Sequence, residues 1–128
     1  IQAVYEYGQR PDKPGLVVMD SPGREPEILT GLAAAGCNVI AFATGRGAPQ
    51  GFPFVPVLKI TGSRTAAEKM IDHIDMNLSA VIDGGDTIPD AGHRVLEELV
   101  LVASGAMTKA ELSGYVNSMD IYMRGPVI

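Results

Sequence analysis

The residues most suited to chemistry lie in a glycine-rich stretch that follows an apolar run. Gly45, Gly47 and Gly51 surround a single arginine, Arg46, directly after Thr44. Glycine lets the backbone turn with positive φ and approach a ligand closely, so that N–H groups can face an anion. The planar guanidinium matches a carboxylate in bidentate fashion. We therefore favour a carboxylate site here over a tight turn whose arginine is only solvated.

The same stretch does not fit a dinucleotide fingerprint. Its glycines are spaced one residue too widely for G-x-G-x-x-G, and they follow the second predicted strand instead of the first. Pro49, Pro53 and Pro56 forbid the helix that would receive a pyrophosphate. NAD is therefore excluded, and a phosphate- or nucleotide-binding module rests on the glycines alone.

Two further candidates lie near this stretch in the predicted sheet. Asp20 ends an apolar run and is equally suited to bind a ligand, as a metal ligand or as an acceptor for a substrate hydroxyl, and to cap the next helix. Lys59 interrupts an apolar strand, so it either reaches solvent from an edge strand or points into a cleft, and its apolar neighbours favour the cleft. Together with Arg46 and Arg24, Lys59 would give a dianion a local positive site in a chain of net charge -5.

Metal-ligating residues form only a weak pattern. Asp75 and Asn77 belong to an oxygen-rich stretch suited to a hard divalent cation, but acidic side chains near helix ends are usually solvated. His73 and His93 are too far apart for a local ligand pair, and the single Cys37 is expected to pack as a small hydrophobe. Asp75 and Asn77 are therefore the candidates for a metal, and weak ones.

The elements that must position these residues alternate between strand and helix. Apolar runs predict strands over residues 16–19, 37–44, 57–61 and 80–82. Proline and capping patterns predict helices beginning near Pro26, Thr65, Pro89 and Thr108, the second and fourth with capping boxes to Glu68 and Glu111. The first strand, its helix and the strand over 37–44 have the order of a right-handed βαβ unit.

This order predicts an α/β fold, a three-layer Rossmann-like domain with a mostly parallel sheet flanked by helices. Ligands of such sheets bind beyond the carboxyl ends of the strands, where the candidates above lie. Residues 1–14 are expected to form an entrance arm or linker and residues 15–128 the domain. The apolar tail over 120–128 is typical of a segment docked on another surface.

Composition excludes other classes of protein. The chain has 128 residues, of which 46% are hydrophobic, so one domain with a sizeable core is expected. No basic cluster suggests nucleic-acid binding, and no window is apolar enough to span a membrane. One cysteine and no basic leader favour a cytoplasmic protein. A chain that opens at Ile1 is expected to be processed or part of a longer one.

Several stretches together resemble a known family. They read MDSPG, ATGRGAPQGFPFVPVLKITGS, DMN, VASGAMTKAEL and RGPVI, and the most specific part runs from Thr44 to Lys59. The chain resembles the C-terminal part of the altronate dehydratase and D-galactarate dehydratase family, hydro-lyases of sugar acids related to sulfolactate sulfo-lyase large subunits. It departs from the family pattern at Ser21, Ala48, Gly62–Ser63 and Leu78–Ser79. These departures leave the sugar acid, or a sulfonated acid, open.

The resemblance implies a reaction and missing partners. Family members remove the proton α to a carboxylate and lose the β-hydroxyl, giving a 2-keto-3-deoxy acid with help from iron, manganese or magnesium. The metal is bound here or in the N-terminal and middle regions that accompany this part, and this piece alone is expected to be inactive. Arg46 and the N–H groups around Gly45 and Gly47 would bind the carboxylate with help from Lys59, while Thr44 or Asp20 contacts hydroxyls.

Two matters stay open at this point. The general base is unassigned, and so is the oligomeric state, a homo-oligomer included. The alternative function is a non-catalytic module that packs against the rest of the enzyme and holds subunits together, since apolar surface is typical of interfaces.

Overall fold

The computed structural model describes residues 1–116 and 119–122, which fall into two compact units. The first contains residues 1–37 together with 119–122, and the second contains residues 38–116. Most of the predicted docked tail, residues 123–128, lies outside the described residues. The expected division into an arm over 1–14 and a domain over 15–128 stays a prediction.

The first unit is a short parallel ladder with one helix. Strand β1 (Ala3–Tyr5) pairs with β2 (Val17–Met19), and α1 (Glu25–Ala34) follows. The predicted helix is confirmed, since Pro26 lies in its first turn and Gly36 has a φ of 95° just beyond its end. Gly31 in α1 admits the ring of Tyr7, because a Cβ there would overlap that ring.

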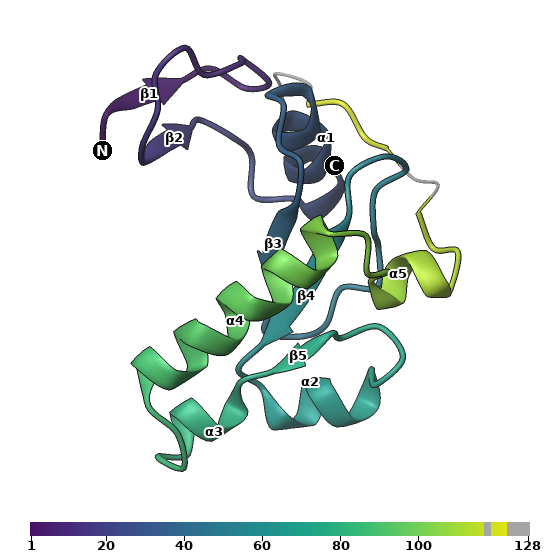
Figure 1. The fold of residues 1–128 in the computed structure, drawn as a ribbon. Coiled ribbons are helices and arrows are strands. Elements are labelled where there is room, and N and C mark those ends of the chain that lie inside the picture. The colour runs from purple at the N-terminus through teal and green to yellow at the C-terminus, as the bar shows by residue number, and fades with distance from the viewer. Residues whose placement is uncertain (117–118, 123–128) are drawn as a thin grey trace. The chain divides into compact units, whose positions relative to one another are not determined.

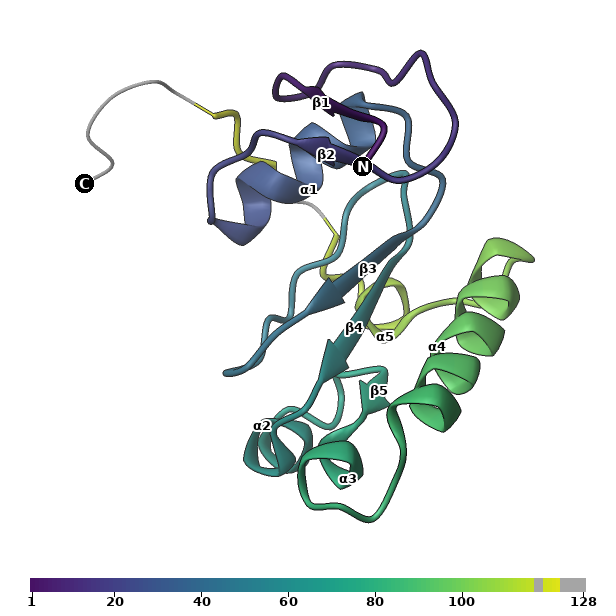
Figure 2. The same ribbon diagram turned by 90° about the vertical axis from the view of Figure 1, so that its left-hand side faces the viewer.

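The second unit holds a three-stranded parallel sheet in the order β3–β4–β5. Its strands are β3 (Ile40–Ala43), β4 (Val57–Thr61) and β5 (Met76–Asn77). Its helices are α2 (Arg64–Lys69), α3 (Ser79–Ile82), α4 (Ile88–Ala103) and α5 (Lys109–Leu112). Figures 1 and 2 show α2, α3 and the beginning of α4 near the end of the sheet to which the arrows of β3 and β4 point.

The core of this unit gathers around β4. Val57 and Leu58 are almost fully buried, and Ile40 of β3 and Phe52 of the loop between the two strands are buried as well. A continuous apolar strand is typical of the centre of a parallel sheet, which both faces cover. The predicted α/β class with parallel strands flanked by helices is thus confirmed.

The predicted single sheet and its first βαβ unit are wrong in detail. In the described residues β2 pairs with β1 and β3 pairs with β4, so the strands on either side of α1 belong to different sheets. The βαβ unit is instead β4–α2–β5. The sequence favoured the earlier one because βαβ reasoning uses order along the chain, whereas the partner of β3 comes after a long proline-rich loop.

Two local predictions are also wrong. Residues 80–82 belong to α3 instead of a strand, because a short apolar run does not distinguish the two. Helix α2 is capped by Ser63, whose side chain accepts the N–H of Ala66, and not by a box from Thr65 to Glu68. The box between Thr108 and Glu111 is confirmed at α5.

The helices of the described residues were also compared with the length and hydropathy of a membrane span. None of them is both long enough and apolar enough to cross a bilayer.

Candidate functional site

The turn after β3 is held by contacts that its own sequence provides. The Thr44 hydroxyl accepts a hydrogen bond from the Gly47 N–H at 3.1 Å. Gly47 has a φ of 100°, a conformation that side chains disfavour, and an added Cβ would overlap the sulfur of Met70. We call residues 44–47 the Arg46 turn. Glycine at 47 is therefore required both by the backbone conformation and by the space available.

Strand β4 supports this turn and the residues after it. The Thr61 hydroxyl donates to the Thr44 carbonyl at 2.6 Å. The Lys59 ammonium donates to the carbonyl of Ala48 at 2.9 Å and also to that of Gln50. A buried ammonium is costly unless its donors are paired, and these carbonyls supply the partners. The 44–50 loop is thereby tied to β4 at three carbonyl groups.

Arg46 differs from its neighbours in the turn. Its side chain is exposed, and no ion pair or hydrogen bond joins it to another of the described residues. Thr44 and Gly45, on its N-terminal side, line a cavity of about 790 Å³ at the carboxyl edge of the sheet. The turn therefore presents a guanidinium outward beside a concave surface.

Lys59 lies on the central strand, so the edge-strand interpretation is wrong. It is 0% exposed, and its ammonium lies 5.5 Å from the centre of the Phe42 ring, within the range of a cation–π contact. The side chain thus points inward beneath the loop. A direct contact between Lys59 and a substrate stays a prediction, whereas the geometry supports a role in positioning the loop.

Asp20 belongs to the first unit, as does Arg24. Asp20 is exposed and lines a cavity of about 380 Å³ together with Glu6, Tyr7, Ser21, Pro22 and Tyr122. The structure describes Asp20 within that unit only, and its contact with substrate hydroxyls stays a prediction.

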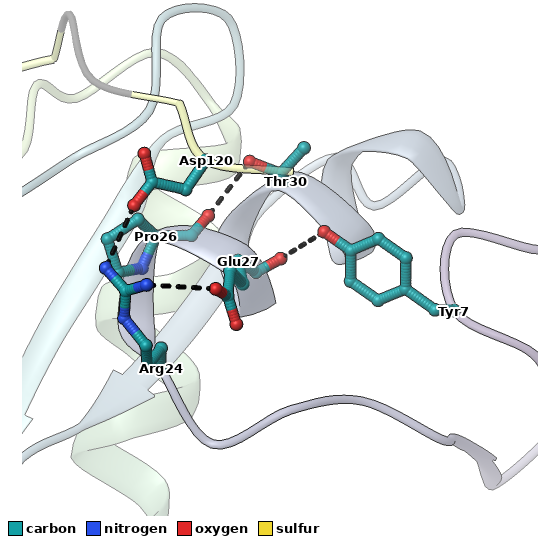
Figure 3. A network of polar contacts seen from close by, with 6 residues as sticks. All are labelled: Tyr7, Arg24, Pro26, Glu27, Thr30 and Asp120. Atoms are coloured by element: carbon teal, nitrogen blue, oxygen red, sulfur yellow. Dashed lines mark hydrogen bonds and ion pairs between the residues drawn. The ribbon is translucent and has the colours of Figure 1, made fainter. Parts of the chain in front are cut away.

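Arg24 has two carboxylate partners. Figure 3 shows its guanidinium between Glu27 and Asp120, each at 3.1 Å. In the same network the Tyr7 hydroxyl donates to the Glu27 carbonyl at 2.6 Å, and burial raises the pKa of Tyr7. An arginine paired with two carboxylates presents little net positive charge to a third anion. Arg24 is thus a structural residue of the first unit.

The metal candidates make structural contacts instead. Both carboxylate oxygens of Asp75 accept backbone N–H groups, one from Lys59 at 2.6 Å and the other from Lys109 at 2.8 Å. The Asn77 side-chain oxygen accepts the Ser79 N–H at 3.0 Å. Among the described residues, no three His, Cys, Asp or Glu side chains gather as a metal site would require. These residues do not fit a divalent metal, and the implied metal stays a prediction.

Thr61 and Met70 are the supporting residues that sequence reasoning missed. Thr61 ends β4 with its hydroxyl on the Thr44 carbonyl, and Met70 packs against Gly47. The available signal was a threonine at the end of each of two neighbouring apolar runs, Thr44 and Thr61, because adjacent parallel strands bring the residues at their carboxyl ends together.

The chain matches the model of the D-galactarate/altronate dehydratase C-terminal family over residues 1–127, and it belongs to that family. It is 33% identical to the galactarate dehydratase (L-threo-forming) of Escherichia coli, over 99% of this chain and 24% of the relative. It is 34% identical to the altronate dehydratase of Escherichia coli, over 88% and 22%. The beta subunit of the (2R)-sulfolactate sulfo-lyase of Chromohalobacter salexigens is 34% identical, over 90% and 30%.

The chain thus spans about a quarter of the length of these curated relatives. The predicted family is confirmed, and so is the expectation that this part belongs to a larger enzyme in the relatives. The shared length covers both units, including the Arg46 turn and β4.

Proposed function

We propose that this chain is the substrate-binding C-terminal part of a hydro-lyase that dehydrates a sugar acid of the galactarate or altronate type. The observation that carries this proposal is the Arg46 turn, whose hydrogen bonds fix its backbone while its guanidinium stays exposed and unpaired among the described residues. A turn with a fixed backbone and an arginine that no described carboxylate already pairs is suited to bind the carboxylate of a ligand. The names of the relatives, a galactarate dehydratase and an altronate dehydratase, support a carboxylate as the ligand.

The proposed chemistry explains why a fixed cation is needed. A base removes the α-proton, and the electron pair moves onto the carboxylate, which becomes an enediolate with a second negative charge. Return of that pair forms the carbon–carbon double bond and expels the β-hydroxyl, which leaves as water after taking up a proton. The enol then tautomerises to the 2-keto-3-deoxy acid. A guanidinium beside the carboxylate stabilises the doubly negative enediolate more than the singly negative substrate carboxylate, which lowers the barrier.

Each residue of the turn has a proposed role. Arg46 binds the substrate carboxylate in bidentate fashion, and the N–H groups around Gly45 and Gly47 add donors. Thr44 holds the turn through the Gly47 N–H, and Lys59 fixes the loop from below. The general base and the implied metal are proposed to come from the part of the enzyme that lies outside this chain, so this chain alone is expected to be inactive.

The test is the change Arg46→Ala in the complete enzyme. Loss of a carboxylate-binding guanidinium that acts in the transition state is expected to lower kcat/KM for the sugar acid at least about a hundredfold. The matched control is Arg64→Ala, because Arg64 is also exposed and its partner is the surface residue Asp83. Kinetics of Arg46→Ala within about twofold of the parent, with the fold intact, would contradict the proposal.

A second function is favoured by one observation. Helix α4 exposes several large apolar residues, among them Leu96 and Val100, and exposed apolar surface is typical of interfaces. A non-catalytic module that holds the enzyme together would need that surface and not Arg46. The kinetics of Arg46→Ala therefore separate the two functions.

A further inference from the structure

The cavity beside the Arg46 turn is almost wholly apolar. It measures about 790 Å³ and is bounded by the carboxyl ends of β3, β4 and β5, by α3 and by the beginning of α4. Its apolar lining includes Ile60, Leu78, Val81, Ile82, Ile88 and Val95, and no charged side chain belongs to the lining. Figures 1 and 2 show these elements converging at one end of the sheet.

The polar groups of this cavity are already engaged. Thr44 and Ser63 carry its two hydroxyls. The Thr44 oxygen accepts the Gly47 N–H, and the Ser63 oxygen accepts the Ala66 N–H at 3.2 Å as the cap of α2. A sugar acid would bring a carboxylate and several hydroxyls into a surface with no charge to pair them, and burying unpaired polar groups is costly. The size of the cavity suits a substrate, but its chemistry does not.

An apolar strip continues from this cavity along α4. Ile82 and Ile88 at its rim are 74% and 77% exposed. In steps of four residues, Ile88 is followed by Gly92, Leu96 and Val100. This spacing keeps the three apolar side chains on one broad side of the helix. Only Ala91 and Val102 of this helix are buried. We call the cavity together with Ile88, Leu96 and Val100 the α4 groove.

We propose that the α4 groove binds an apolar segment of the same polypeptide, from the part of the dehydratase that precedes the residues matched here. The relatives are about three to five times as long as the stretch they share with this chain, and the family model describes a C-terminal part. A covalently attached segment has a high effective concentration, so it occupies such a groove ahead of a separate partner. The proposal rests on family membership and apolar surface, and it holds whether or not Arg46 binds substrate.

A segment bound in the α4 groove would also lie next to the Arg46 turn. Thr44 and Gly45 lie on the wall of the groove, and Arg46 follows them directly. A segment seated in the groove would therefore end or pass beside the guanidinium. If Arg46 binds the substrate as proposed above, the junction between this chain and the preceding part is the place at which residues of both meet the substrate.

The test places a photo-crosslinker in the complete enzyme. p-Benzoylphenylalanine replaces Leu96 in one variant and the adjacent, exposed Glu97 in a matched control. After irradiation without substrate, position 96 is expected to crosslink to residues of the preceding part within one chain, and position 97 to give at least about tenfold less product, since it faces another side of the helix. Denaturing gels separate crosslinks within a chain from those between chains, and mass spectrometry identifies the crosslinked residue.

Two outcomes of the crosslinking would overturn the proposal. Products of twice the chain mass would show that a second copy covers the groove, and equally low crosslinking at 96 and 97 would show that the groove is open. An independent measurement uses Leu96→Asp and Glu97→Gln. The first is expected to lower the melting temperature of the complete enzyme by several degrees, and the second to leave it within about 1 °C. A melting temperature unchanged by Leu96→Asp would also contradict the proposal.

Discussion

The 44–50 loop and helix α4 belong to the same unit and differ in how many of their groups find partners within it. The loop lacks regular structure, yet Thr44, Lys59 and Thr61 bind its backbone groups. Helix α4 is regular over 16 residues, yet most of its apolar side chains remain exposed. The loop is specified by contacts within the described residues, whereas the exposed apolar residues of the helix are covered by none of them. Regular secondary structure is therefore a poor guide to which part of this unit is complete.

The largest effect on stability is expected for Lys59→Met. The change leaves the carbonyls of Ala48 and Gln50 buried without this donor, which costs about 2–4 kcal/mol when both are counted. Amide hydrogen exchange of residues 44–61 in the complete enzyme measures the loss locally. Lys69→Met on the exposed end of α2 is the matched control, with an expected change below about 0.5 kcal/mol. Equal exchange in both variants would mean that the loop is not held from below.

A smaller loss is expected for Gly47→Ala. Its φ of 100° and the sulfur of Met70 both oppose a Cβ, so we expect about 1–3 kcal/mol of destabilisation. Gly45→Ala is the control within the same turn, because a Cβ there meets no atom within 4 Å. Urea unfolding of the complete enzyme, followed by exchange of the turn, compares the two variants. If Gly45→Ala proved the more damaging, the geometry of the turn would be wrong.

Removal of the cap of α4 tests the other half of the comparison. The Thr87 hydroxyl accepts the Asp90 N–H at 3.2 Å, and Thr87→Ala is expected to cost about 1 kcal/mol. Thr87→Ser keeps the hydroxyl and is expected to restore most of that stability. Exchange rates of the first turn of α4 provide the measurement. A cost spread over the whole helix would indicate that packing on another surface, more than its own cap, holds α4.

The smallest effect concerns the ion pair between Asp86, which precedes α4, and Arg94 within the helix. A hydrogen bond from Arg94 lowers the pKa of Asp86 below its usual range. The pair therefore contributes to stability above the ordinary aspartate pKa of about 3.9, and the contribution disappears as the pH falls through the lowered pKa of the folded state. Arg94→Gln is expected to return the pKa of Asp86 toward its usual value, as a carboxyl NMR titration would measure. An unchanged titration of Asp86 in this variant would show that Arg94 is not the cause of the lowered pKa.

Much of the fold follows from the sequence. Pro26 with Gly36, Pro89 with Gly105, and Thr108 with Glu111 mark helix ends through local geometry, and the structure has helices at these places. Strand pairing could not be predicted in the same way. The partner of β3 is a strand that follows a long loop, and local sequence patterns do not indicate which strands pair across such a loop.

The candidate site divides along the same line. Gly47 could be recognised because its conformation is local, and its φ of 100° agrees with the expected turn. The inward direction of Lys59 could be favoured from its apolar neighbours, but its carbonyl partners depend on how residues 48–50 fold back over β4. The apolar character of the α4 groove arises from five elements that only the folded chain brings together.

Asp75 has a consequence for how acidic residues of long enzymes are interpreted. Its two oxygens connect the backbone of β4 to the first residue of α5, two elements that lie far apart along the chain. An amide at this position has one accepting atom and so could keep only one of the two bonds. An aspartate with these two backbone contacts can be invariant among homologous sequences because the fold requires it. Invariance alone would therefore not identify Asp75 as a metal ligand.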